Sequence, residues 1–190
     1  MLEFLMGNDR REMHRAFQAA DRAYRDGDLE RLRAALGDPP GFPNCVQPHA
    51  LGCGDFPLEY AIYWSPLAFV KCLLVEGADP NYPGQGGFPS LIAALSTERP
   101  DKHELLALLL ACGADPAQRR NNDWTPLHYA VALRDIGAVR ILIDFGADPT
   151  LRTRIDDCTT PTEDAASAGF DEAVKLLGDK IEKLDARADC

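Results

Sequence analysis

The chain has 190 residues, of which 46% are hydrophobic, so it suits one globular domain or one short repeat array and is not intrinsically disordered. Its formal net charge of −10 disfavours nucleic acid and anionic membranes as partners, because both are negatively charged. No stretch approaches the roughly 20 apolar residues of a membrane span. The N-terminus has its apolar residues before its charges, the reverse of a signal peptide, so we expect a cytoplasmic protein.

Pairs of helices are expected along most of the chain. The first pair lies between Arg15 and Leu36, where the sequence GDLERL introduces the second helix. A proline opens each later short helix, because its missing N–H has no partner in a first helical turn. Thr125 and Thr160 precede two of these helices and are placed to cap them with a hydroxyl. The prolines are Pro57, Pro89, Pro126 and Pro161.

The tetrapeptide Gly-Ala-Asp-Pro marks the end of the longer helices. It occurs at 77–80, 113–116 and 146–149, with separations of 36 and 33 residues. Each copy follows a leucine-rich run with apolar residues at i, i+3 and i+4, the period of a helix. The glycine suits the left-handed residue that ends a helix, and the proline prevents the helix from resuming. This periodicity predicts a repeat of about 33 residues.

The segment TPLHYAVALRDIGAVRILIDFGADP, residues 125–149, resembles a nearly complete ankyrin repeat with the signature TPLH-x-A. Residues 160–177 and 56–80 fit the same template, and 88–116 fits with about four extra residues. The resemblance implies an all-α ankyrin-repeat solenoid of about five helix-turn-helix repeats with short β-hairpin-like loops. It also implies that His128 forms hydrogen bonds between turns.

The template predicts boundaries within a single domain. They are an N-terminal capping repeat at 11–38, an extended loop at 39–55, central repeats at 56–87, 88–124 and 125–159, and a C-terminal capping repeat at 160–187.

Two segments depart from the template. The loop from Gly37 to Asp55 is longer than its equivalents, so it is either functional or a tolerated surface insertion. The segment from Ser96 to Lys102 lengthens the turn between two helices, and its charge predicts a solvated loop.

Within the first of these loops, Cys45, His49 and Cys53 form a C-x3-H-x3-C pattern that would supply three zinc ligands. No second Cys/His pair completes a tetrahedral site, so we expect no structural metal here. The six cysteines are expected to be thiols. The chain has no G-x-S-x-G, P-loop or dinucleotide-binding sequence, so we expect no catalytic residues, no cofactor and no enzymatic activity.

A concave partner-binding face, built from loop tips and first helices, follows from the resemblance. Apolar side chains occupy several of its variable positions, where a surface meant only for water would be polar. We therefore expect a partner to contact Tyr63, Trp64, Leu95, Trp124 and Leu133. For Trp64 the alternative is packing beneath the 37–55 loop.

Two arginines add a second candidate feature. Arg119 and Arg152 occupy equivalent positions in successive repeats, so stacking should bring them together on adjacent loops. They form either a basic strip that binds a carboxylate or phosphate of the partner, or ion pairs with the neighbouring Asp156 and Asp157. We include both arginines among the candidate partner-binding residues.

These patterns predict a monomeric module that binds another protein. A narrower alternative is an immunity or antitoxin protein whose acidity suits the basic surface of a toxic enzyme. A third is a metal protein or enzyme that uses the 39–55 loop.

Overall fold

The computed structural model describes residues 2–47, 55–82, 88–119, 123–155 and 158–188. Within these ranges it contains ten α-helices and no strand. The chain divides into two compact units, residues 1–90 and 91–190. The expected all-α fold of paired helices is therefore confirmed.

The first unit contains two helix pairs. Helix α1 packs against α2 and α3, and α3 packs against α4. α1 starts ahead of residue 11, where the first repeat was expected to begin. The helices are α1 (Leu2–Asp26), α2 (Leu29–Leu36), α3 (Pro57–Trp64) and α4 (Leu67–Val75).

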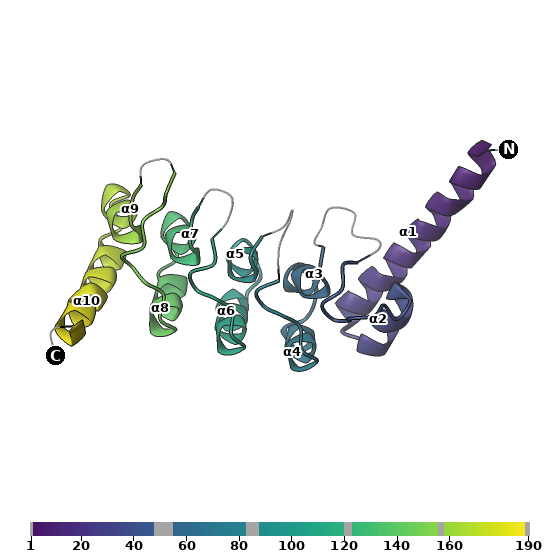
Figure 1. Ribbon diagram of the computed structural model, residues 1–190, viewed down its shortest axis with the longest axis horizontal. Coiled ribbons are helices and arrows are strands. Elements are labelled where there is room, and N and C mark those ends of the chain that lie inside the picture. Colours follow the sequence, from purple (N-terminus) through teal and green to yellow (C-terminus); the bar gives the residue numbers. More distant parts are fainter. Residues whose placement is uncertain (1, 48–54, 83–87, 120–122, 156–157, 189–190) are drawn as a thin grey trace. The chain divides into compact units, whose positions relative to one another are not determined.

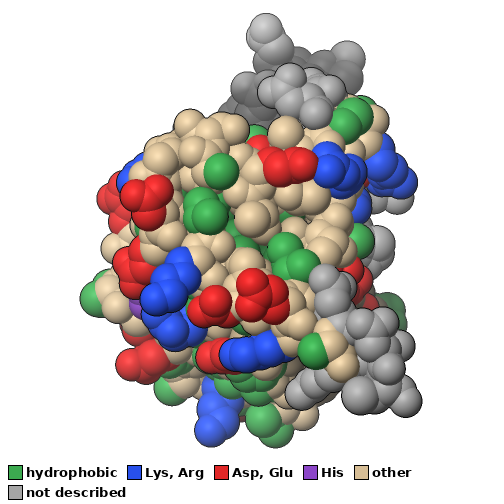
Figure 2. All heavy atoms as spheres, turned by 90° about the vertical axis from the view of Figure 1, so that its left-hand side faces the viewer, with side chains coloured by type: hydrophobic (Ala, Val, Ile, Leu, Met, Phe, Trp, Pro, Cys, Tyr) green, Lys and Arg blue, Asp and Glu red, His purple; other side chains and the backbone are tan. Residues whose placement is uncertain are grey.

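The second unit contains three helix pairs, whose first helices α5, α7 and α9 form one row and whose second helices α6, α8 and α10 form another (Figure 1). Helices α6 and α8 pack against each other, and both carry leucines that are almost fully buried. At the α9–α10 end, carboxylates lie beside lysine and arginine side chains (Figure 2). The helices are α5 (Ser90–Leu95), α6 (Lys102–Ala111), α7 (Pro126–Ala132), α8 (Ile136–Asp144), α9 (Pro161–Ser167) and α10 (Asp171–Ala188).

The predicted start and stop signals act as expected. Thr125 and Thr160 each accept a hydrogen bond from the backbone N–H three residues later, and both form capping boxes. Gly77, Gly113 and Gly146 have φ of 94°, 93° and 90°, which a side chain would strain. The alanine after each glycine donates its N–H to a carbonyl five residues back, which closes the helix end.

Polar side chains on α3 and α7 tie each helix to the following loop. The imidazole of His128 is hydrogen-bonded through Nδ1 to the Thr125 hydroxyl (2.8 Å) and through Nε2 to the Thr159 carbonyl (3.2 Å). Burial lowers the pKa of His128, so the neutral ring donates from Nε2 and accepts at Nδ1. The structural role implied for His128 is confirmed.

Glu59 occupies the position in α3 that His128 occupies in α7. It is 2% exposed, and its carboxylate accepts hydrogen bonds from the N–H groups of Asp55 (2.9 Å) and Phe88 (3.2 Å). Burial raises the pKa of Glu59. The Glu59 carboxylate therefore accepts a hydrogen bond from a backbone N–H of the following loop, whereas His128 donates a hydrogen bond to a backbone carbonyl of its following loop.

The loops have hairpin character without forming strands in the described ranges. Backbone hydrogen bonds cross two of them, from Gln47 N–H to the Asp55 carbonyl (2.8 Å) and from Thr153 N–H to the Thr159 carbonyl (3.0 Å). The described part of the 37–55 loop is also anchored by Asn44. Its side chain donates to the Gly77 carbonyl (2.8 Å) and accepts from the Asp79 N–H (2.7 Å).

The caps predict a contrast between two threonines of α9. Thr160→Val removes the capping hydroxyl and should lower the free energy of unfolding by about 1 kcal/mol. Thr162→Val should be neutral or stabilising, because the buried Thr162 hydroxyl has no hydrogen-bond partner among the described residues. Urea denaturation followed by circular dichroism measures both, and equal losses would show that the cap is not the cause.

Candidate functional site

Helix α7 lies between two grooves of the second unit. One, here called the α5–α7 groove, has a volume of about 700 Å³ and is lined by residues 95–98, 102–103, 129 and 133–137. The other, the α7–α9 groove, has a volume of about 580 Å³ and is lined by residues 124, 131–132, 153, 159, 164 and 167–168. Volumes of this size suit several side chains of a bound segment.

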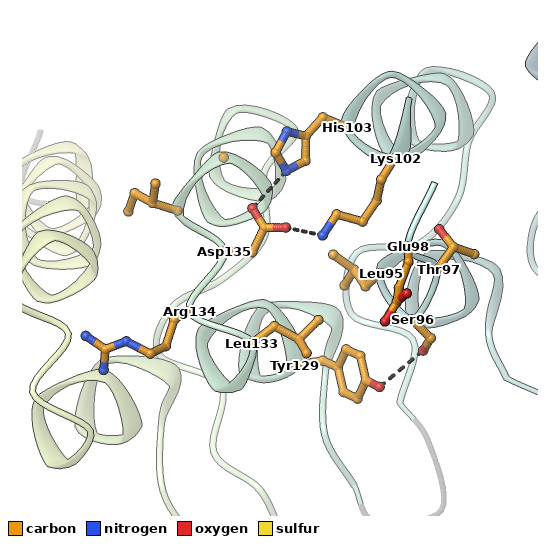
Figure 3. Close-up of a pocket in the computed structure, with 12 residues that line it drawn as sticks. Leu95, Ser96, Thr97, Glu98, Lys102, His103, Tyr129, Leu133, Arg134 and Asp135 are labelled. Carbon is orange, nitrogen blue, oxygen red and sulfur yellow. Dashed lines mark hydrogen bonds and ion pairs between the residues drawn. The ribbon is translucent and has the colours of Figure 1, made fainter. Parts of the chain in front are cut away.

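The lengthened turn before α6 forms one wall of the α5–α7 groove (Figure 3). Arg99 of this turn is half-buried and forms an ion pair with Asp101. The hydroxyls of Ser96 and Tyr129 are hydrogen-bonded across the groove at 3.1 Å. None of residues 96–102 is buried, so the turn lies at the surface as expected, while several of its polar groups bind one another and the wall of the groove.

The carboxylate of Asp135 lies between the ammonium of Lys102 and the imidazole of His103 in this groove (Figure 3). Its oxygens are 2.6 Å from Lys102 Nζ and 2.8 Å from His103 Nε2. Burial acts to raise the pKa of Asp135, but hydrogen bonds from Lys102, the Ala138 N–H and His103 lower it overall. Charge in this groove is thus largely neutralised.

Gly137 lets His103 approach α8 closely enough to reach Asp135. A Cβ at residue 137 would lie 2.5 Å from Cε1 of His103. Because no side chain stands there, the imidazole packs directly on the helix.

The α7–α9 groove is more apolar. Half-buried Trp124 lines one side, and its ring packs edge-on against Tyr129 with centroids 6.3 Å apart. Val131, Ala132 and Ala168 add apolar surface. Asp164, in the first turn of α9, is the one charged residue among the described residues that line this groove.

Comparison with known proteins identifies the repeat. A family model described as ankyrin repeats (3 copies) matches residues 91–188, slightly more than half of the chain. The chain belongs to the ankyrin-repeat family. These repeats include all the residues that line the two grooves.

Relatives are similar to this ankyrin-repeat chain over much of its length. A putative ankyrin repeat protein of fowlpox virus, FPV014, is 29% identical over 87% of this chain and 36% of its own. Ankyrin repeat protein nuc-2 of Neurospora crassa is 33% identical over 64% of this chain and 11% of its own. Human neurogenic locus notch homolog protein 4 is 35% identical over 55% of this chain and 5% of its own length. The chain therefore spans little more than a third of the first relative and less of the others.

The residues predicted to contact a partner differ in how exposed they are in the second unit. Leu133 is 46% exposed at the α5–α7 groove, and Trp124 lines the α7–α9 groove. Leu95 is only 2% exposed, so its predicted exposure is wrong. α5 is a short helix whose residues are all buried, and Leu95 therefore belongs to the core.

In the first unit, Tyr63 is half-buried and Trp64 is 45% exposed at the end of α3. The guanidinium of Arg25 lies 4.9 Å from the centre of the Trp64 ring, and Tyr60 packs beside it. Helix α1 thus supplies packing for Trp64. Its contact with a partner stays a prediction.

The two predicted arginines lie in a ladder of ion pairs at the loop tips. Arg119 donates to the Asp123 carboxylate (2.7 Å) and to the Arg152 carbonyl (2.9 Å). Arg152 in turn binds Glu163 (2.7 Å), and Arg154 donates to Asp123 through its backbone and its side chain. Of the two sequence-based alternatives, ion pairing is observed, but with Asp123 and Glu163. Asp156 and Asp157 lie outside the described residues.

The expected absence of metal at the long loop stays a prediction, because His49 and Cys53 lie outside the described residues. Burial raises the pKa of the Cys45 thiol, which disfavours the thiolate that zinc requires. Among the described residues, no group of three His, Cys, Asp or Glu side chains is placed to hold a metal ion. No helix in these ranges has the length and apolarity to cross a membrane.

The ladder predicts pH-dependent stability. Hydrogen bonds from Arg154, together with the charges of Arg119 and Arg154, lower the pKa of Asp123 to about 2. The ionised Asp123 carboxylate stabilises the fold fully above its pKa in the unfolded chain, which is about 4. This stabilisation is lost as pH falls through its pKa in the folded protein, which is about 2. Asp123→Asn should therefore be less stable than the parent at pH 7, and the difference should shrink at pH 3.

Urea denaturation at both pH values measures this effect, with Asp144→Asn as the control. Asp144 is an exposed carboxylate on α8, and its replacement removes the same charge. A difference between the parent and Asp123→Asn that is equal at both pH values would contradict the ion-pair origin.

Proposed function

We propose that this ankyrin-repeat protein binds another protein through α7 and the two grooves beside it, and that it acts by binding rather than by catalysis. Ankyrin repeats are generally protein–protein interaction modules. The observation that carries the proposal for this surface is Leu133. It is an aliphatic side chain, 46% exposed, at the C-terminal end of the helix that separates the grooves.

Aromatic side chains also line the grooves on the two sides of α7, one from the helix itself and one from the residue before its N-cap. Tyr129 lines the α5–α7 groove, and Trp124 lines the α7–α9 groove. Tyrosine and tryptophan are enriched among residues that dominate binding energy, because they bury a large area with few rotatable bonds. A partner segment that covers Leu133 would reach both rings.

We further propose that the protein is a monomer in the cytoplasm. Its net charge of −10 favours a partner with a basic surface. Inhibition of a toxic enzyme with such a surface is the second candidate function, supported by the same charge. Arg119 and Arg152 already bind carboxylates of this chain, so an acidic partner would have to displace them.

Leu133→Lys tests the proposal against a matched control. The lysine places a charge in the interface and should weaken partner binding at least tenfold, which corresponds to about 1.4 kcal/mol. Val75→Lys is the control, because Val75 is 78% exposed and also lies at a helix C-terminal end. Lysine suits both positions electrostatically.

The measurement has two steps. Proteins retained by the parent and by Val75→Lys but lost with Leu133→Lys are identified by mass spectrometry. The dissociation constant of the purified candidate is then determined with each variant. Equal affinity for Leu133→Lys and the parent, with unchanged melting temperature, would exclude α7 as the binding surface.

A further inference from the structure

We infer that the α7–α9 groove binds a lysine or arginine side chain of the partner, with Asp164 as the counter-ion. This assignment rests on the function proposed above and specifies the chemistry that one groove selects.

Asp164 differs from the other carboxylates near α7. Asp135 binds Lys102 and His103, Asp123 binds two arginines, and Glu163 binds Arg152. The Asp164 carboxylate has no hydrogen bond or ion pair with any side chain among the described residues, although it is half-buried and lines the groove. A partly buried carboxylate without a partner has lost solvation by water, so an ion pair with a cation lowers its free energy more than it would for a fully exposed carboxylate.

The other walls suit the rest of a basic side chain. Trp124 presents an indole, and Val131, Ala132 and Ala168 present short apolar groups. Lysine and arginine have an aliphatic stem that packs on apolar surface and a cationic head that interacts favourably with aromatic rings. A side chain that enters this groove can therefore bury its stem and place its charge at Asp164.

The negative net charge of the protein also favours a basic ligand. The net charge is −10, and residues 156–190 contain ten acidic and four basic residues. Acidic side chains lie at the α9–α10 end together with lysine and arginine side chains (Figure 2), and the acidic ones outnumber the basic ones in this part of the sequence. Such a field attracts a basic segment and speeds its association with the groove.

A structural role for Asp164 predicts a different result. A carboxylate in the first turn of a helix is stabilised by the helix dipole. That role would make Asp164→Asn less stable without changing the preference for one ligand over another. Glu163 already provides the side chain of the capping box in α9, so Asp164 is not needed for the cap.

The test uses four pools of heptapeptides with degenerate neutral flanks and a fixed central residue. The central residue is arginine, lysine, citrulline or glutamate, and citrulline has nearly the shape of arginine without its charge. Immobilised parent protein should retain the arginine and lysine pools at least fivefold over the citrulline pool, and the glutamate pool least. Salt at about 0.5 M should reduce this preference, because screening weakens the ion pair.

Three variants assign the preference to the groove. Asp164→Asn should abolish it, Asp164→Glu should keep part of it, and Asp144→Asn should keep it in full. Asp144 is an exposed carboxylate of α8, so its replacement changes the net charge equally outside the groove. Melting temperatures of all variants are measured in parallel.

Equal retention of the arginine and citrulline pools by the parent would overturn the assignment, as would an unchanged preference in Asp164→Asn. Either result leaves the proposed function standing if Leu133→Lys still abolishes partner binding. A preference for basic pools that depends on Asp164, with no effect of Leu133→Lys on the partner, would instead support this groove and contradict the wider surface.

Discussion

The hydrogen bond from His128 Nε2 to the Thr159 carbonyl fixes both sides of the α7–α9 groove. The imidazole is held on α7 by the capping hydroxyl of Thr125, and Thr159 itself lines the groove. One neutral side chain therefore links the start of one helix to the loop that leads into the next pair. Burial keeps the ring neutral, since lowering its pKa favours the form that both donates and accepts. A groove built in this way exists before a partner arrives, which lowers the cost of binding.

The arginine ladder supports the same site from the loop tips. Asp123 directly precedes Trp124 and adopts a left-handed φ of 61°, a conformation that few non-glycine residues favour. Its carboxylate accepts hydrogen bonds from Arg119 and from the backbone and side chain of Arg154, which hold this conformation. The arginines thus hold the residue that precedes the tryptophan, and contact of Arg119 or Arg152 with a partner stays a prediction.

The sequence predicted the starts and ends of the helices, because these depend on residues that are close together in the chain. Proline, the capping threonines and the left-handed glycines act within a few residues, so helix starts and ends followed from their order. Trp124 and Leu133 were placed by the repeat template. The inward orientation of Leu95 and the partners of Arg119 depend on segments far away in the chain, and no spacing in the sequence reveals them. Asp164 was missed although a signal existed: it occupies the position that Tyr60 and Tyr129 occupy in two other repeats.

The two grooves differ in charge because their carboxylates differ in partners. Asp135 forms an ion pair with Lys102 and a hydrogen bond with His103, so its carboxylate already has partners within the α5–α7 groove. Asp164 leaves the other groove acidic. A helix with its side chains is about 10–12 Å wide, and an extended chain advances about 3.3–3.6 Å per residue. An extended partner segment that crosses α7 would therefore place its basic residue about three positions from the residue that enters the α5–α7 groove. Leu133 would contact the residue that enters the α5–α7 groove, so that apolar contact and charge act on the same short segment.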